Sequence, residues 1–347
     1  MKKITKLFVV ILSAASFTLS AFAGELSVTG SANASYKMGG ADSANGKGIG
    51  VSNELDFNAS GEIDGGYTWK WQTQLDGASA VNDDTRLEIS GSTGTVGFYI
   101  SENDISSKLG YGIGAMGVGS DFTGPTTVEW GTTMNNYNNI GYATPAGLLP
   151  AGGSLKIAYS PNLNASSGAS YKDAGTTETK VVGSDATAVR VDFVPMDGLK
   201  VGADYMVAKG GADVARRQQS AGVYAKYATG PLTLGMARTG YQPIAQNGFT
   251  SGTLTYDTLM YGAQFAVNDA LSVSYSEEKA DRDTSAVIAP GGGTTAGVTV
   301  AMKVKHLQAA YTVGGATLGL AIADASNSDY TVNKDERTTT FTIGMAF

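Results

Sequence analysis

The chain has 347 residues, with 24 basic and 31 acidic side chains, a net charge of −7, 47 glycines, one histidine and no cysteine. The absence of cysteine excludes disulfide scaffolds, zinc–thiolate sites and thiol nucleophiles, because each of these needs sulfur. The acidic balance argues against nucleic-acid binding, which requires a basic face.

Residues 1–23 have the layout of a secretory signal peptide. Lys2, Lys3 and Lys6 form a basic start, residues 7–12 open a short apolar run, and Ala21-Phe22-Ala23 is an A-x-A cleavage site. We predict Sec-dependent export and cleavage after Ala23. Residues 24–347 then form one domain with 24 − 3 = 21 basic and 31 acidic residues, a net charge of −10. No later apolar run reaches the roughly 18 residues of a spanning helix.

Beyond residue 24, the dominant pattern has a period of two. Apolar and polar residues alternate over residues 25–36, 49–63 and 67–75. Alternation of this kind predicts strands with one apolar and one polar face. No stretch of similar length shows the period of a helix, so the sequence predicts an all-β fold.

The connections between these strands fall into two length classes. Seven are tight turns, near residues 64–66, 93–94, 146–152, 196–198, 229–231, 268–269 and 314–315. Eight are longer polar stretches, near residues 38–48, 77–83, 103–137, 162–182, 210–217, 242–253, 282–297 and 326–336. The alternation gives 7 + 8 = 15 connections and hence 16 strands. We therefore predict a 16-stranded antiparallel transmembrane β-barrel with short periplasmic turns and long external loops, a size that encloses an aqueous channel.

Two further patterns agree with a membrane barrel. Aromatic residues of the apolar face cluster beside the tight turns, which predicts an interfacial ring; these are Tyr67, Phe193, Tyr227, Phe265, Tyr311 and Phe347. Charges of both signs gather on the other face, which predicts a water-filled interior, since charges facing lipid are costly. The basic set is Lys70, Arg86, Lys156, Arg190, Lys200 and Lys226, and the acidic set is Glu54, Asp56, Glu62, Asp76, Glu88, Asp192 and Asp204.

With these features the chain resembles the general porins of Gram-negative bacteria, in the style of alphaproteobacteria. The resemblance covers the predicted mature chain and rests on residues 24–35, the strand at residues 84–91, the long third loop and the terminal Phe347. It implies a homotrimer in the outer membrane, with Phe347 as the signal read by the barrel-assembly machinery. It also implies that residues 103–137 fold inward as a constriction loop, with residues 121–124 as a degenerate form of the family's loop tip. The short second loop puts the family's inter-subunit latch in doubt.

We therefore predict a channel for passive diffusion of small hydrophilic solutes and ions, weakly cation-preferring and without a catalytic step. The predicted constriction places Lys70 and Arg86 on the wall, facing Asp104, Asp121 and Glu129 on the loop. The predicted pore lining is Glu54, Asp56, Glu88, Lys156, Arg190 and Lys226. One alternative is a substrate-selective porin with Tyr111, Trp130 and Tyr137 as a binding track, and another is a structural barrel or adhesin with a plugged lumen.

Three smaller motifs have simpler explanations. Gly112, Gly114 and Gly117 match a dinucleotide fingerprint, but no strand precedes them and no helix follows, as that site requires. His306 has no second histidine and no nucleophile motif, so it is interpreted as a polar residue near the lumen or a loop. No cofactor or metal is expected. Calcium at the external loops remains an alternative, through Asp83 and Asp84, Asp281 and Asp283, or Asp324 and Asp329, although none has EF-hand spacing.

Overall fold

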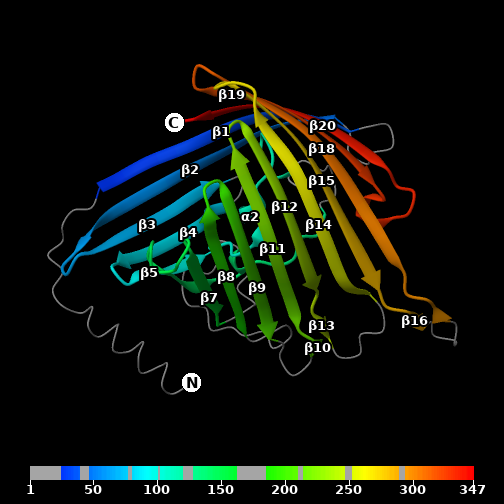
Figure 1. Cartoon of the computed structure of the whole chain (residues 1–347), viewed down its shortest axis with the longest axis horizontal. Coiled ribbons are helices and arrows are strands. Elements are labelled where there is room, and N and C mark those ends of the chain that lie inside the picture. Colours follow the sequence, from blue (N-terminus) through cyan, green and yellow to red (C-terminus); the bar gives the residue numbers. More distant parts are fainter. Residues whose placement is uncertain are drawn as a thin grey trace.

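The computed structural model describes residues 25–39, 47–76, 80–100, 102–119, 128–161, 185–209, 214–246, 252–288 and 294–347. Sixteen antiparallel strands close into a single barrel (Figure 1), which confirms the predicted fold class. The predicted signal peptide and the predicted loop tip at residues 121–124 lie outside the described residues.

The strands follow the chain around the barrel, each paired with the next. They are β1 (Glu25–Gly39), β2 (Lys47–Ile63), β3 (Tyr67–Asp76), β4 (Ala80–Gly91), β5 (Gly94–Ile100), β6 (Asn139–Ala143), β7 (Ser154–Ser160), β8 (Asp185–Met196), β9 (Leu199–Lys209), β11 (Gln218–Thr229), β12 (Leu232–Gln242), β14 (Thr253–Ala266), β15 (Leu271–Thr284), β18 (Thr299–Val313), β19 (Ala316–Ser326) and β20 (Glu336–Ala346). Two small sheets lie in the external connections and pair β10 (Val214–Arg216) with β13 (Ala245–Gln246), and β16 (Val287–Ile288) with β17 (Thr294–Thr295).

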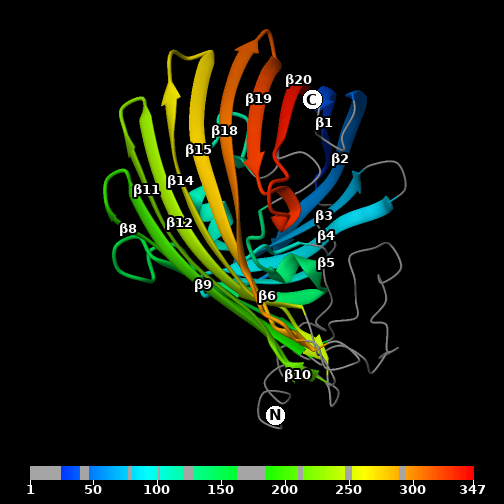
Figure 2. The same ribbon diagram turned by 90° about the vertical axis from the view of Figure 1, so that its right-hand side faces the viewer.

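Tight turns and longer connections alternate around the barrel as predicted. In Figure 2 the turns between β14 and β15 and between β18 and β19 lie at the same end as the C-terminus, whereas β10 lies at the other end. Glycine makes the tight turns feasible. At the β8–β9 turn, Gly198 has φ of +77°, and a Cβ there would lie 2.2 Å from the Ala228 carbonyl oxygen. The second external connection is shorter than predicted, because β4 already begins at Ala80.

The barrel closes where the first and last strands meet. β1 pairs with β20, and the backbone of Phe347 extends this ladder with two hydrogen bonds to Gly30. A Cβ on Gly30 would lie 2.9 Å from the Phe347 ring, so this ring lies directly over the glycine. The start of the first strand and the end of the last strand therefore both lie on the tight-turn side of the barrel.

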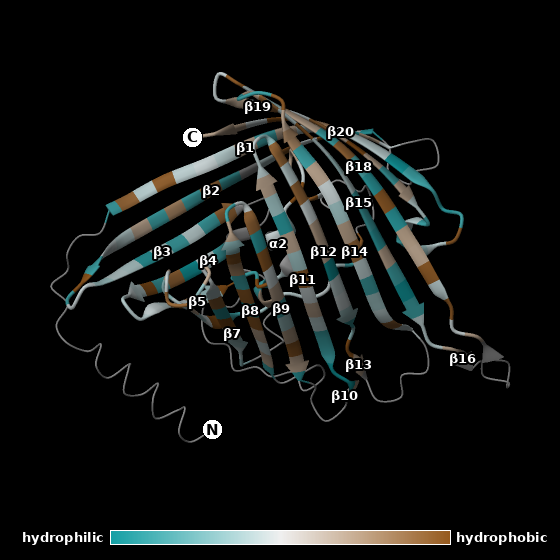
Figure 3. Ribbon diagram, viewed as in Figure 1, coloured by the Kyte–Doolittle hydropathy of each residue, from teal (hydrophilic) through white to brown (hydrophobic). Residues whose placement is uncertain are grey.

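Apolar and polar side chains alternate along the strands, visible as brown and teal bands in Figure 3. Outward-facing apolar residues are exposed along many strands, as a lipid-facing wall requires; examples are Leu26, Val96, Val223, Leu234 and Ile343. The predicted aromatic ring is also exposed at Tyr67, Tyr227, Phe265, Tyr311 and Phe347. Among the described residues, no helix has the length and apolarity to cross a membrane.

Candidate functional site: the third loop and the facing wall

The connection between β5 and β6, residues 101–138, is termed L3. It contains helix α2 (Ser107–Tyr111) and the 3-10 turn η2 (Met134–Asn136). Backbone N–H groups of L3 donate hydrogen bonds to three side chains that point inward from β14, β15 and β18. These bonds run from Gly114 to Gln264 (3.4 Å), from Ala115 to Ser274 (2.8 Å) and from Met116 to Gln308 (2.9 Å). L3 therefore lies inside the barrel, against this wall.

Two basic residues hold the first part of L3. Arg190 Nη1 donates to the Ser106 carbonyl oxygen (2.6 Å), and Lys226 Nζ donates to the Gly112 carbonyl oxygen (3.1 Å). Arg190 is itself held by Asp192, whose two carboxylate oxygens accept from Nε, and by the ring of Tyr224 beneath it. Arg190 is only 9% exposed. Arg190, one of the predicted lining residues, therefore contacts L3 and is largely covered by it.

Glu129 belongs to the part of L3 that packs near β14. Its N–H donates to Tyr330 Oη (3.1 Å), its carbonyl oxygen accepts from Thr258, and its carboxylate accepts from the Gly131 N–H (3.0 Å). Burial raises the pKa of the Glu129 carboxyl, although backbone hydrogen bonds partly oppose the shift. β14 is twelfth in the barrel and β4 is fourth, so these strands lie on opposite sides.

The single histidine lies beneath L3. His306 is 1% exposed, and a Cβ on Gly119 of the loop would lie 2.4 Å from its ring. Its Nε2 is 3.7 Å from Glu278 Oε2 on the neighbouring strand. This agrees with the prediction of a polar residue close to a loop.

The glycines of the apparent nucleotide fingerprint shape the loop. Gly112 ends α2 in the left-handed region, with φ of +43°, and the run follows this short helix rather than a strand. A Cβ on Gly114 would lie 1.7 Å from the Gly117 carbonyl oxygen, so the chain folds back too tightly for a larger residue. The segment therefore lacks the strand–turn–helix context of a dinucleotide site.

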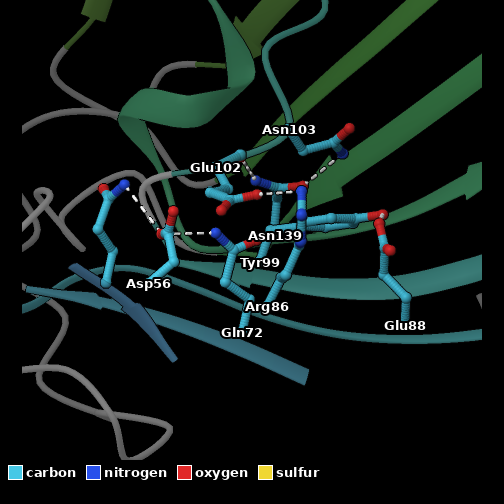
Figure 4. Close-up of polar contacts among 9 residues, drawn as sticks. Asp56, Gln72, Arg86, Glu88, Tyr99, Glu102, Asn103 and Asn139 are labelled. Carbon is cyan, nitrogen blue, oxygen red and sulfur yellow. Dashed lines mark hydrogen bonds and ion pairs between the residues drawn. The ribbon is translucent and has the colours of Figure 1, made fainter. Parts of the chain in front are cut away.

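The wall formed by β2 to β5 carries a second polar network, drawn in Figure 4. Asp56 accepts hydrogen bonds from Gln72 (2.8 Å) and Gln74 (3.2 Å). Arg86 on β4 forms an ion pair with Glu102 at the start of L3 (3.1 Å). Further bonds join Tyr99 Oη to Glu88 (2.9 Å) and Asn103 to Asn139 (2.9 Å).

This network, termed the acidic wall, has an excess of negative charge. Asp56, Glu88 and Glu102 oppose Arg86, and Lys70 lies directly across from Glu88 in the β3–β4 register. The formal charges of these five residues sum to −1. Burial raises the pKa of the Glu102 carboxyl, although Arg86 partly opposes the shift.

The structure changes the predicted pairing across the constriction. The described acidic partner of Arg86 is Glu102, one residue before the predicted start of the loop. Glu129 packs near β14, on the opposite side of the barrel from Lys70 and Arg86, and no described contact joins it to either residue. Asp104 accepts a hydrogen bond from Thr133 within the base of L3. Asp121 lies outside the described residues.

The other predicted lining residues lie on the inward face. In the strand registers, Glu54 and Asp56 on β2, Glu88 on β4, Lys156 on β7 and Lys226 on β11 alternate with outward apolar neighbours. Lys156 is exposed and lies across from Arg190 in the β7–β8 register. Two adjacent inward cations therefore differ in role, because L3 covers only Arg190.

The predicted aromatic track is mostly used in packing. Tyr111 is fully buried, and its ring centre lies 6.2 Å from that of Trp130. Tyr137 is half-buried against an apolar cluster that includes Ile105 and Met134. Lys108 lies over the Trp130 ring at 5.4 Å. These contacts hold L3 together.

Among the described residues, no group of three or more His, Asp or Glu side chains is arranged to hold a metal ion. Several acids considered for calcium have basic partners instead. Asp281 pairs with Lys279 and Asp329 with Lys334, and Asp324 lies 3.5 Å from Arg337.

Comparison with known proteins identifies the family. A sequence profile of Gram-negative porins matches residues 9–347, and the chain therefore belongs to this family. No curated protein sequence matches the chain.

Solved structures of bacterial porins have a similar fold. The anion-selective porin from Comamonas acidovorans matches with a TM-score of 0.66 and 14% identity, over 93% of this chain and 100% of that chain. OmpF from Salmonella typhi, in complex with daunomycin, matches with a TM-score of 0.64 and 14% identity, over 93% of this chain and 98% of that chain. The trimer form of OmpT from Vibrio cholerae matches with a TM-score of 0.61 and 11% identity, over 94% of this chain and 100% of that chain. Family and fold together support an outer-membrane channel for passive diffusion.

Proposed function

We propose that the channel conducts small hydrophilic solutes and ions with a modest preference for cations, and that the acidic wall is the main source of this preference. Solutes pass between L3 and this wall, down their gradients and without a chemical step. A negative wall raises the local concentration of cations and lowers that of anions.

The observation that supports this proposal is the Arg86–Glu102 ion pair. Glu102 neutralises Arg86, which would otherwise be an unpaired cation facing the pore. The two negative charges of Asp56 and Glu88 then exceed the one positive charge of Lys70. The net charge of residues 24–347, 21 − 31 = −10, acts in the same direction at the mouths. Salt confines this long-range effect to about 8 Å at physiological ionic strength, so the preference should be larger at low salt.

Selectivity has to be argued from these side chains, because the fold does not determine it. The Comamonas acidovorans structure shares the barrel at a TM-score of 0.66 and is described as anion-selective. Porins of one fold therefore differ in selectivity through the charges on the wall and the loop.

Zero-current potentials in a planar bilayer under a salt gradient test the proposal. We expect Glu88→Gln with Glu102→Gln to shift the potential toward anions, because the acidic wall changes from −1 to +1. Lys70→Gln with Arg86→Gln should shift it toward cations. Arg337→Gln is the matched control, since Arg337 is exposed on the outward parity of β20. Parental potentials in both double variants would place the selectivity elsewhere, and an absence of conductance would favour a plugged structural barrel.

We also propose that the chain is exported with its first 23 residues as a cleaved leader, and that the barrel assembles as a homotrimer. The A-x-A site supports cleavage, and the trimeric OmpT relative supports the assembly state. Small outward residues on β1, such as Ala32 and Ala34, permit close contact between barrels.

A further inference from the structure

The last external connection of the barrel sends one side chain into the interior. This connection, residues 327–335 between β19 and β20, is termed L8 and contains the 3-10 turn η3 (Ser328–Tyr330). Tyr330 is only 8% exposed and packs in an apolar cluster with Met302. Met302 shares the inward face of β18 with His306, because alternate residues of a strand point to one side. Tyr330 therefore lies inside the barrel, although L8 joins two strands at their external ends.

Inside the barrel, Tyr330 contacts the second part of L3. The Glu129 N–H donates a hydrogen bond to Tyr330 Oη (3.1 Å), across a separation of 201 residues in the sequence. Val128, which is 1% exposed, belongs to the same apolar cluster as Tyr330. The Glu129 carbonyl oxygen also accepts a hydrogen bond from Thr258 of β14. This part of L3 is therefore held both by L8 and by the barrel wall.

Tyr330 is in turn fixed by side chains of the wall. Arg282 of β15 donates from Nη2 to the Tyr330 carbonyl oxygen (3.1 Å), and its guanidinium lies over the Tyr330 ring at 4.9 Å. The Tyr256 ring of β14 meets the Tyr330 ring edge-on, with 5.3 Å between the ring centres. Ser328 donates to the Glu336 carboxylate (2.6 Å), and both residues are buried. These contacts connect L8 to β14, β15 and β20.

The backbone of L8 is strained at the point where Tyr330 enters the barrel. Asn327, Asp329 and Tyr330 have φ of +51°, +56° and +55°, in the left-handed region. Asparagine and aspartate tolerate this region, but a bulky residue such as tyrosine rarely adopts it. A conformation of this kind persists only where the surrounding contacts enforce it. Tyr330 should therefore leave this conformation, and the interior of the barrel, when its contacts are lost.

We propose that L8 is a strap on the constriction loop and that Tyr330 is the positioning residue through which it acts. With Tyr330 inserted, residues 128–131 of L3 stay against the wall. With Tyr330 withdrawn, the turn relaxes and this part of L3 is released, while Arg190 and Lys226 still hold the first part. L3 therefore has two separate holds, and one of them belongs to an external loop.

The strap connects the external surface to the pore. Val332, two residues after Tyr330, is 63% exposed, so L8 is accessible from outside while its tyrosine is buried. A change in L8 therefore reaches the constriction without any change in the charge of the acidic wall. The strap requires a conducting channel but not the proposed cation preference.

Single-channel recordings of the full barrel test the strap. We expect Tyr330→Ala to make transitions between conductance levels roughly tenfold or more frequent, because the buried ring and its hydrogen bond are both lost. Tyr330→Phe should show a smaller increase, since it keeps the ring and loses only the hydroxyl that accepts from Glu129. Tyr275→Ala is the matched control, because it removes an exposed outward tyrosine of β15 and should behave like the parent.

A second measurement follows L8 itself. The chain has no cysteine, so Ser328→Cys introduces a single thiol, at a fully buried position. We expect this thiol to react slowly with a membrane-impermeant thiol reagent in the parent background, and at least tenfold faster in combination with Tyr330→Ala. Val332→Cys, at an exposed position of the same loop, should react at one rate in both backgrounds.

Parental current fluctuation in Tyr330→Ala would overturn the proposal, and so would an unchanged labelling rate of Ser328→Cys. If Tyr330→Ala fails to assemble, Tyr330→Phe decides, and parental fluctuation together with parental labelling in that variant would overturn the strap. The zero-current potential separates this proposal from the proposed function. It should stay parental in every Tyr330 variant, because no charge changes, whereas the proposed function is tested by variants of the acidic wall.

Discussion

At the level of single residues, the Arg86–Glu102 ion pair leads us to expect that the ion selectivity of the pore depends on pH. An ordinary glutamate has a pKa of about 4.3. Burial raises the pKa of the Glu102 carboxyl, so this group takes up its proton at a higher pH than an ordinary glutamate does. Protonation removes one negative charge and leaves Arg86 uncompensated, so the acidic wall changes from −1 to 0. We expect the cation preference to decline as the pH falls through the raised pKa of Glu102, measured as the zero-current potential against pH.

In Glu102→Gln this step should be absent, and the potential at neutral pH should already equal that of the acidified parent. Asp324→Asn is the control, because it removes an exposed carboxylate from the outward face. An unchanged pH profile in Glu102→Gln would show that another group is responsible for the titration.

The same residues show where sequence interpretation reaches its limit. A period of two identifies Arg86, Lys156 and Arg190 as inward-facing, because alternate side chains on a strand share a face. It cannot predict that Arg190 is buried and Lys156 is exposed, because this depends on the path of L3. The L3 residue that contacts Arg190 is Ser106, which is 84 residues away in the sequence. Glu102 was missed for a related reason: it precedes the predicted start of the loop, and its partner lies 16 residues away on β4.

At the level of elements, L3 keeps its position through side chains of the barrel wall. Replacing Arg190 with Gln removes the bond to Ser106 and leaves Asp192 without its guanidinium. A hydrogen bond to a charged group contributes about 1.5–3 kcal/mol, so loop opening should become roughly tenfold or more frequent. Single-channel recordings should show this as increased current fluctuation.

Lys156→Gln is the matched control, because it also removes one inward positive charge, on the adjacent strand. It should alter selectivity without increasing the fluctuation. If Lys156→Gln and Arg190→Gln gave equally noisy channels, lumen charge rather than loop anchoring would be the cause.

At the level of the whole molecule, sixteen strands were predictable because turns and strands are local features. Turn chemistry at sites such as Gly198 and Gly314-Gly315 fixes where each hairpin reverses, and alternation fixes which face meets lipid. The path of L3 was implied only by the family resemblance, since its contacts with Gln264, Ser274 and Gln308 span 150 to 192 residues. The sequence therefore predicted the barrel well and the contacts inside it poorly.

The seam between β1 and β20 allows a last prediction, about assembly of the whole barrel. Phe347 closes the ladder with two backbone hydrogen bonds to Gly30, and its ring is exposed at the tight-turn end. The Phe347 ring is thus part of the seam and exposed at the tight-turn end, and we expect an assembly factor to bind it there. We expect Phe347→Asp to lower the amount of heat-modifiable barrel in the outer membrane while export, measured by leader cleavage, stays intact.

Phe341→Asp, on the same face of β20, is the control for the cost of a charge on the outward wall. Equal loss from both variants would mean that outward charge alone impairs assembly, whereas a larger loss from Phe347→Asp would show that the terminal position itself is read.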